Sequence, residues 1–120
     1  MPDVLRTSWG VNEAFPGYFD CDSSWYQAID NVEAAGVVVM WSAGNEGPYD
    51  QTMRSPADRT TTLTNAFSVG ATYVEAPFEA PPWSSRGPSG CRGPNEVKPE
   101  VVAPGVEILS AKVDGGYHYL

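Results

Sequence analysis

The sequence predicts an α/β fold built on a parallel sheet. The stretch Val37–Trp41 carries no charge and begins with three β-branched residues in succession. This pattern is typical of a strand that is buried on both faces, as in a parallel sheet. A segment with apolar residues at helical spacing precedes Val37–Trp41, and a short segment with a strand-like pattern comes before that helix. The order strand, helix, strand is that of a βαβ unit, in which the two strands are parallel.

The first half of the chain supplies this unit. Val4–Ser8 is expected to form the first strand, and Val11–Cys21 a loop. Ser24 is expected to cap the helix, with Gln27 three residues later completing a capping box. Gly36 stands where a C-terminal cap belongs. Between these limits an apolar stripe recurs at helical spacing, formed by Trp25, Ile29, Val32 and Ala35.

The second half contributes strands but no second long helix. Val37–Ser42 is the central strand, and Ala66–Thr72 reads as a third. Tyr49–Thr64 between them is polar and turn-rich, without a clear period. Val101–Ala103 and Val106–Leu109 are predicted as short extended pieces. A parallel sheet needs cover on both faces. The sheet is therefore either half-covered or completed by sequence outside this chain.

Composition excludes several classes of protein. The chain has 120 residues, enough for one domain or part of one, with 7 basic and 15 acidic residues and a net charge of −8. Nucleic acid and anionic membranes are excluded as partners, because binding phosphates needs clustered Lys and Arg. No apolar run of about 18 residues could span a bilayer, and the N-terminus has no signal-peptide pattern.

The two cysteines, Cys21 and Cys91, lack the Cys-x-x-Cys spacing of a metal or redox site. Two free thiols are the simpler interpretation. The alternative is a single disulfide, which needs an oxidising compartment and Cα atoms within about 7 Å.

Few residues could carry chemistry on their own. The single histidine, His118, is expected to be structural, and none of the ten serines lies in a Gly-x-Ser-x-Gly elbow. One histidine and two distant cysteines do not make a zinc site, and Asp20 and Asp22 are expected to be solvated. The turn after the central strand presents a neutral donor, Asn45, at the strand's carboxyl end, where open α/β sheets place ligand sites. This turn lacks the Gly-Lys-Ser/Thr sequence of a phosphate-binding loop.

Four segments, taken together and in order, resemble the subtilisin-like serine proteases, the subtilases. They are Asp3–Gly10 (DVLRTSWG), Ala34–Gly47 (AAGVVV through AGNEG), Trp83–Pro88 (WSSRGP) and Lys98–Ser110 (KPEVVAPGVEILS). Two substitutions depart from the family pattern: Trp83 replaces Phe, and Glu100 replaces Asp. The resemblance implies a three-layer subtilisin-like parallel sheet, truncated here and with one clear long helix. Residues 1–120 would then be a partial catalytic domain.

The resemblance also implies roles for individual residues. Asn45 would direct its side-chain N–H into an oxyanion hole. Ser8, Trp9 and Gly10 would form an exposed strand edge that pairs with the substrate backbone. The pocket for the side chain before the scissile bond would be lined by Ser42, Ala43 and Gly44. Trp9 stands where family members often carry Leu and would narrow or extend a subsite; core packing is the alternative role for this side chain.

In this family the triad aspartate and histidine precede the first matching segment, and the nucleophilic serine follows the last. The resemblance therefore implies a parent endopeptidase that cleaves polypeptides through an acyl-enzyme, whereas the isolated chain is expected to be inactive. The alternatives are a catalytically dead binding or structural module and a nucleotide-binding α/β domain. No cofactor is expected, although calcium is compatible with the parent, which would be extracellular or in the cell envelope. Uncovered sheet surface would favour self-association of the fragment.

Overall fold

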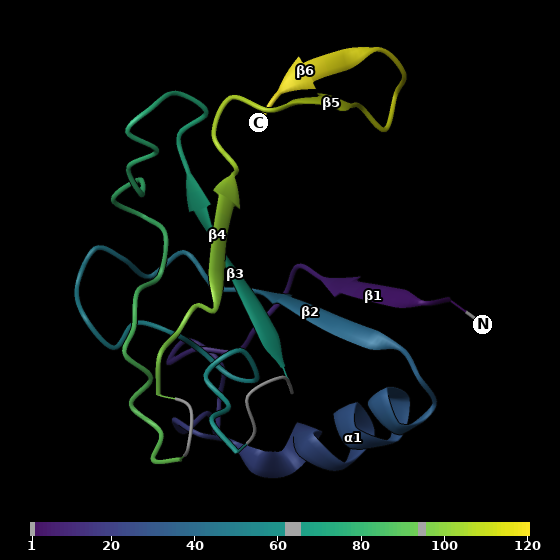
Figure 1. Cartoon of the computed structure of the whole chain (residues 1–120), viewed down its shortest axis with the longest axis vertical. Helices are drawn as coiled ribbons and strands as arrows, with labels where there is room; N and C mark the ends of the chain where they lie inside the picture. Colours follow the sequence, from purple (N-terminus) through teal and green to yellow (C-terminus); the bar gives the residue numbers. More distant parts are fainter. Residues whose placement is uncertain (1, 62–65, 94–95) are drawn as a thin grey trace.

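The computed structural model describes residues 2–61, 66–93 and 96–120 and contains a parallel sheet with one helix packed against it (Figure 1). The four strands lie in the order β1-β2-β3-β4, and every neighbouring pair is parallel. Their bounds are Val4–Thr7 for β1, Val38–Ser42 for β2, Phe67–Thr72 for β3 and Val101–Pro104 for β4. The predicted α/β class is confirmed. No helix in the described ranges is long and apolar enough to cross a bilayer.

The helix α1 (Tyr26–Ala34) is preceded by a 3₁₀ turn, η1 (Ser23–Trp25). This turn changes the capping that we predicted. The carboxylate of Asp22 accepts the backbone N–H of Ser24 at 2.9 Å, so Asp22 caps the turn and Ser24 does not cap the helix. Gln27 donates its side-chain amide to Asn31 instead of completing a capping box. The C-terminal prediction is confirmed, because Gly36 follows the helix with φ of +85°.

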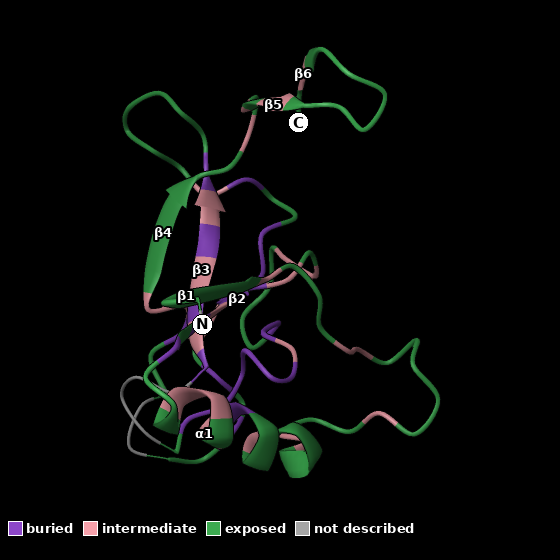
Figure 2. Ribbon diagram, turned by 90° about the vertical axis from the view of Figure 1, so that its right-hand side faces the viewer, coloured by how far each residue is buried: buried purple, intermediate pink, exposed green. Residues whose placement is uncertain are grey.

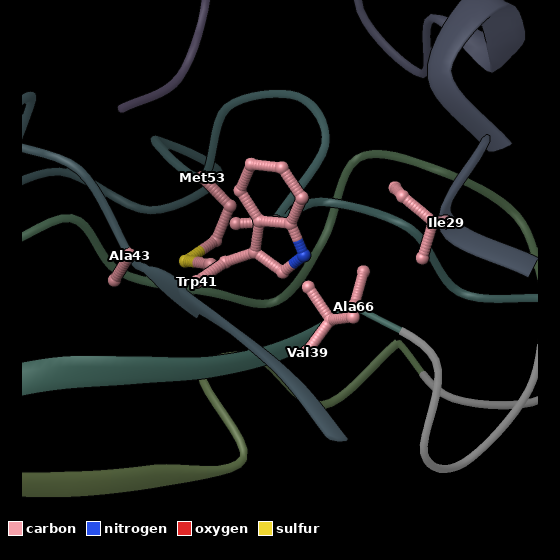
Figure 3. Close-up of a cluster of buried hydrophobic side chains, with 7 residues drawn as sticks. Ile29, Val39, Trp41, Ala43, Met53 and Ala66 are labelled. Atoms are coloured by element: carbon pink, nitrogen blue, oxygen red, sulfur yellow. The ribbon is translucent and has the colours of Figure 1, made fainter. Parts of the chain in front are cut away.

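One face of the sheet is covered and the other is open. Val39 and Trp41 of β2 are 3% and 4% exposed and pack with Ile29 of α1 in the hydrophobic core (Figure 3). Val38, one residue away on the opposite face, is 53% exposed. β4 is exposed at all four of its residues (Figure 2). The expectation that β2 is buried on both faces was wrong, because α1 covers only one side of the described sheet.

The C-terminal part forms a separate antiparallel hairpin that stands away from the main sheet (Figure 1). Its strands are β5 (Leu109–Ala111) and β6 (Tyr117–Tyr119). The predicted extended piece Val106–Leu109 was placed too early. Glu107 has φ of +57°, which is incompatible with a strand, and Ile108 exchanges two backbone hydrogen bonds with Leu120 at the mouth of the hairpin.

The polar segment between β2 and β3 is irregular, as predicted, but much of it is buried. Ser55, Asp58 and Thr60 are at most 2% exposed. Such burial is tolerated when every polar group has a partner, and this segment hydrogen-bonds to the loop before α1 and to the residues after β3. The end of the predicted range, residues 62–64, lies outside the described residues.

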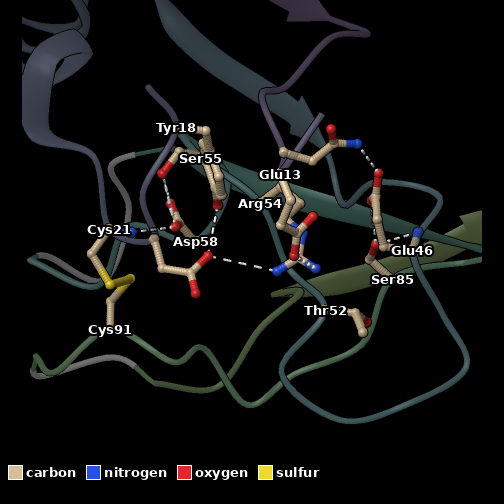
Figure 4. Close-up of polar contacts among 12 residues, drawn as sticks. Glu13, Tyr18, Cys21, Glu46, Thr52, Arg54, Ser55, Asp58, Ser85 and Cys91 are labelled. Atoms are coloured by element: carbon tan, nitrogen blue, oxygen red, sulfur yellow. Dashed lines mark hydrogen bonds and ion pairs between the residues drawn. A yellow bond between two sulfur atoms is a disulfide. The ribbon is translucent and has the colours of Figure 1, made fainter. Parts of the chain in front are cut away.

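Cys21 and Cys91 form a disulfide with a Cα–Cα distance of 5.5 Å (Figure 4). The interpretation as two free thiols was therefore wrong. Spacing alone could not indicate the pairing, because the two residues are 70 positions apart in the chain. A cross-link over a loop of this length stabilises a fold by about 4 kcal/mol in the chain-entropy view.

Candidate active site

A pocket of about 240 Å³ opens where β1 and β2 end. One group of lining residues follows β1 and includes Ser8, Trp9 and Gly10; the other is the end of β2 with the turn after it. All seven residues that the sequence predicted for the site line this pocket: Ser8, Trp9, Gly10, Ser42, Ala43, Gly44 and Asn45. The fold therefore brings together two segments that are more than 30 residues apart.

A second cavity, of about 640 Å³, lies over the sheet and shares five lining residues with the first, including Ser42, Gly44 and Asn45. Its remaining walls are largely apolar and come from β2, β3 and β4. Asn45 lies where the two spaces meet. A group held at this junction reaches both the narrower pocket and the wider cavity.

The side chain of Asn45 is exposed. Its backbone N–H donates to Oε2 of Glu46 at 2.8 Å, whereas none of the hydrogen bonds between described residues uses its side-chain amide. The amide is thus available to a ligand. An exposed and uncommitted donor on a short turn is suited to bind developing negative charge.

The carboxylate of Glu46 holds this turn in place. It accepts hydrogen bonds from the backbone N–H of Asn45, from Oγ of Ser85 at 3.1 Å and from Nδ2 of Asn12 at 2.9 Å (Figure 4). Ser85 Oγ also lies 3.1 Å from the backbone N of Glu46 and accepts its N–H. These bonds join three segments of the chain. Sequence reasoning missed all three supporting side chains, because no spacing relates Asn12 and Ser85 to the turn.

Backbone hydrogen bonds fix the same turn from both sides. Ala43 N–H donates to Val69 O of β3, and Gly44 O accepts from Ser85 N–H, both at 3.0 Å. Gly44 has φ of +113°, and a Cβ added there would lie 2.5 Å from Oε2 of Glu46. Glycine is therefore required at this position by both conformation and space.

The other side of the pocket differs from the expected strand edge. β1 ends at Thr7, one residue before the predicted limit, and Ser8–Gly10 is irregular. Trp9 is 46% exposed and packs edge-on against two aromatic rings, with centroid distances of 5.4 Å to Trp25 and 4.9 Å to Trp41. Trp9 therefore both anchors the segment to the core and presents part of its ring to solvent.

The charge of Arg54, which also lines the pocket, is neutralised locally. Its guanidinium pairs with Glu13 at 2.5 Å and with Asp20 at 3.6 Å (Figure 4). Asp20 also accepts the hydroxyl of Tyr18 at 2.8 Å; burial, followed by this hydrogen bond, raises the pKa of Tyr18 above its usual range. Asp20 and Asp22 thus have protein partners, and the Asp20 side chain remains 67% exposed, in agreement with its predicted solvation.

His118 lies in β6 and is not among the residues that line the pocket. The pocket therefore contains no described histidine to act as a general base. It also contains no described set of metal-ligating side chains; the group of this kind found in the described residues is Cys21, Asp58 and Cys91, which lies elsewhere.

Solved structures place this sheet, helix and turn within the subtilisin-like protease fold. Sphericase aligns with a TM-score of 0.74 and 26% identity over 98% of this chain and 36% of its own. A second protease structure, the S41 psychrophilic protease, aligns with a TM-score of 0.73 and 28% identity, again over 98% of this chain and 36% of its own.

Sequence comparison shows the family. Residues 2–119 match the model of the subtilase family, to which the chain therefore belongs. It is 34% identical over 116 residues to serine protease AprX of Bacillus subtilis (strain 168), which covers 96% of this chain and 25% of that protein. It is 29% identical over 117 residues to subtilisin-like protease SBT6.1 of Arabidopsis thaliana, covering 95% of this chain and 10% of that protein. The chain thus spans a quarter or less of these relatives.

We predict that Gly47→Ala destabilises the turn. A Cβ at this position would lie 2.3 Å from the carbonyl oxygen of Ser84 and 2.6 Å from that of Pro82, so backbone would have to move. We expect the free energy of unfolding to fall by about 1–3 kcal/mol in urea denaturation. Gly90→Ala is the matched control, because nothing lies within 4 Å of its added Cβ. Equal effects of the two substitutions would contradict the steric explanation.

Proposed function

We propose that residues 1–120 are part of the catalytic domain of a serine endopeptidase and contribute one oxyanion donor and part of the substrate cleft. The observation that carries the proposal is the free side-chain amide of Asn45, on a turn held by Glu46, at the rim of a pocket shared with Ser8–Gly10. Family membership supports the peptide-hydrolase class. The substrate is then a polypeptide bound across this pocket.

The proposed chemistry follows from charge. Attack on a peptide carbonyl places negative charge on its oxygen, and a neutral donor that is already in place stabilises that charge without reorganisation. A carboxylate beside such a site would oppose this effect. Glu46, however, accepts bonds from Asn45, Ser85 and Asn12, which disperse its charge. Its role in this proposal is to orient the turn.

The nucleophile, its base and the second oxyanion donor are proposed to come from the parent outside residues 1–120. The partial coverage of the relatives supports this division. The disulfide supports an extracellular or cell-envelope location for the parent, because such bonds persist in oxidising compartments. Acyl transfer of this kind needs no cofactor in the chain.

The first test is activity of the pure 120-residue chain. We expect no hydrolysis of a peptide anilide and no labelling by a fluorophosphonate, because no described histidine lines the pocket to activate a serine hydroxyl there. Time-dependent hydrolysis that a serine-directed inhibitor blocks would contradict the proposed division. In the parent, inhibitor-sensitive hydrolysis is expected; polypeptide binding without hydrolysis there would instead indicate a catalytically dead module.

In the parent, we predict that Asn45→Ala lowers kcat with little change in KM, because the donor acts chiefly on the transition state. The expected loss is about 100- to 1000-fold, the range known for removal of an oxyanion donor from subtilisin, which belongs to the same family. Asn31→Ala on α1 is the control, since Asn31 does not line the pocket. A rise in KM with kcat unchanged would assign Asn45 to ground-state binding only.

We further propose that the isolated chain self-associates through the open face of the sheet. Val4, Val38 and Val101 share this face on three different strands and are 50%, 53% and 45% exposed. Sedimentation velocity should show concentration-dependent association, which Val38→Lys weakens by placing a charge on that face. Tyr49→Lys, at a residue that is 78% exposed and outside the sheet, should leave association unchanged. A monomer at all concentrations would contradict this proposal.

A further inference from the structure

Two cysteines and an aspartate meet at a point outside the candidate active site. One ligand atom from each of Cys21, Asp58 and Cys91 lies within 4.8 Å of the others (Figure 4). Cys91 and Asp58 are 6% and 2% exposed, and Cys21 is half-buried. The two sulfurs are bonded to each other in this structure. The third group, a buried carboxylate beside a disulfide, has no role in the proposed peptide hydrolysis.

The Cys21 side of this cluster is held by hydrogen bonds that do not depend on the disulfide. Cys21 N–H donates to Oδ2 of Asp58 at 3.0 Å, and Asp22 N–H donates to Oγ of Ser55 at 3.1 Å. Cys21 also has φ of +64°, a conformation that non-glycine residues seldom adopt without surrounding support. These contacts keep the thiol side chain of Cys21 near the carboxylate of Asp58.

The Cys91 side is anchored separately. Ser89 donates its hydroxyl to the backbone oxygen of Asp58 at 2.6 Å and accepts the N–H of Cys91 at 3.1 Å. The hydroxyl of Thr60 lies 3.4 Å from the backbone oxygen of Cys91 and donates to it. Because both cysteines are tied to the segment around Asp58, breaking the sulfur–sulfur bond leaves the two sulfurs close together.

We propose that in the reduced state Cys21, Cys91 and Asp58 bind one Zn²⁺, with water as the fourth ligand. Two thiolates and a carboxylate form a donor set that suits tetrahedral zinc, at about 2.3 Å for sulfur and 2.0–2.2 Å for oxygen. A tetrahedron of this size separates its two sulfurs by about 3.8 Å. A change of side-chain torsions at Cys21 and Cys91 would open the present bond to this separation.

The reaction balances as two steps. A thiol or phosphine reductant supplies two electrons, and two protons from water convert the disulfide into two thiols. Zn²⁺ then replaces one proton on each sulfur, so that binding releases two protons to solvent. The ionised carboxylate of Asp58 joins without further proton loss. The disulfide and bound zinc therefore exclude each other, because both use the sulfur atoms of Cys21 and Cys91.

The electrostatic environment favours a cation here. None of the ion pairs between described residues includes Asp58, which is 2% exposed, and burying a carboxylate without a cationic partner is unfavourable. A divalent cation would offset this cost of burying a negative charge. Ser55 donates its hydroxyl to the carboxylate at 2.8 Å and so orients it, as residues behind metal ligands commonly do.

The test compares oxidised and phosphine-reduced chains under anaerobic conditions, with Co²⁺ and Zn²⁺ as the metals. Reduced chain should bind one Zn²⁺ per monomer in equilibrium dialysis. With Co²⁺ it should show the intense visible bands of tetrahedral coordination together with sulfur-to-cobalt charge transfer, and Zn²⁺ should remove both. Oxidised chain should show neither. This readout needs no variant and does not depend on protease activity, so it stands apart from the proposed function.

Variants then identify the ligands. Asp58→Asn should weaken Zn²⁺ binding by about tenfold or more, and the double variant Cys21→Ser, Cys91→Ser should abolish the charge-transfer band. Asp20→Asn, which removes a nearby charge without removing a ligand, should leave the tetrahedral spectrum unchanged. The melting temperature of oxidised Asp58→Asn shows whether this variant folds; if it does not, the spectrum of the reduced wild-type chain decides. Reduced chain without a tetrahedral cobalt spectrum, or equal Zn²⁺ binding by oxidised chain, would overturn the proposal.

Discussion

The structure depends on a constraint that is unusual for a segment without regular structure: residues 52–60 are largely buried and largely polar, so their polar groups need partners inside the protein. Ser55 O accepts from Val11 N–H, and Thr52 N–H donates to Arg86 O. Arg59 reaches α1, where it pairs with Asp30 at 2.8 Å. Meeting these requirements draws the loop before α1, the helix itself and the residues after β3 around one strip of chain.

The geometry of the pocket depends on this arrangement of segments around residues 52–60. Its two sides come from separate segments, and Val11, just beyond Gly10, is joined to Ser55 by a backbone hydrogen bond. The turn on the other side is held through Glu46 by Asn12 and Ser85. The backbone of the turn that carries Asn45 is thus held in place without any ligand. Such preorganisation is what an electrostatic role in catalysis requires.

The sequence predicted the features that local patterns encode. The strands that became β1 to β4, the helix and its glycine end were found within one or two residues, because periodicity and caps are local. The motifs that resemble the subtilases predicted the seven residues that line the pocket. Contacts over long separations were not predictable from one sequence: the disulfide, the Glu46 hydrogen bonds and the burial of residues 52–60 all join distant segments. Ser24 failed as a cap because a 3₁₀ turn moved the helix start past it.

The burial of the polar residues in 52–60 has a thermodynamic consequence. Exposing apolar surface on unfolding raises the heat capacity, whereas exposing polar surface lowers it. Here the most deeply buried side chains include Thr60, Asp58, Ser55, Ser68 and Ser85, while the described apolar core is small and covers one face of the sheet. The heat-capacity change per residue should therefore be lower than in proteins with a fully enclosed apolar core. A smaller heat-capacity change gives a flatter dependence of stability on temperature, and so a less pronounced loss of stability in the cold.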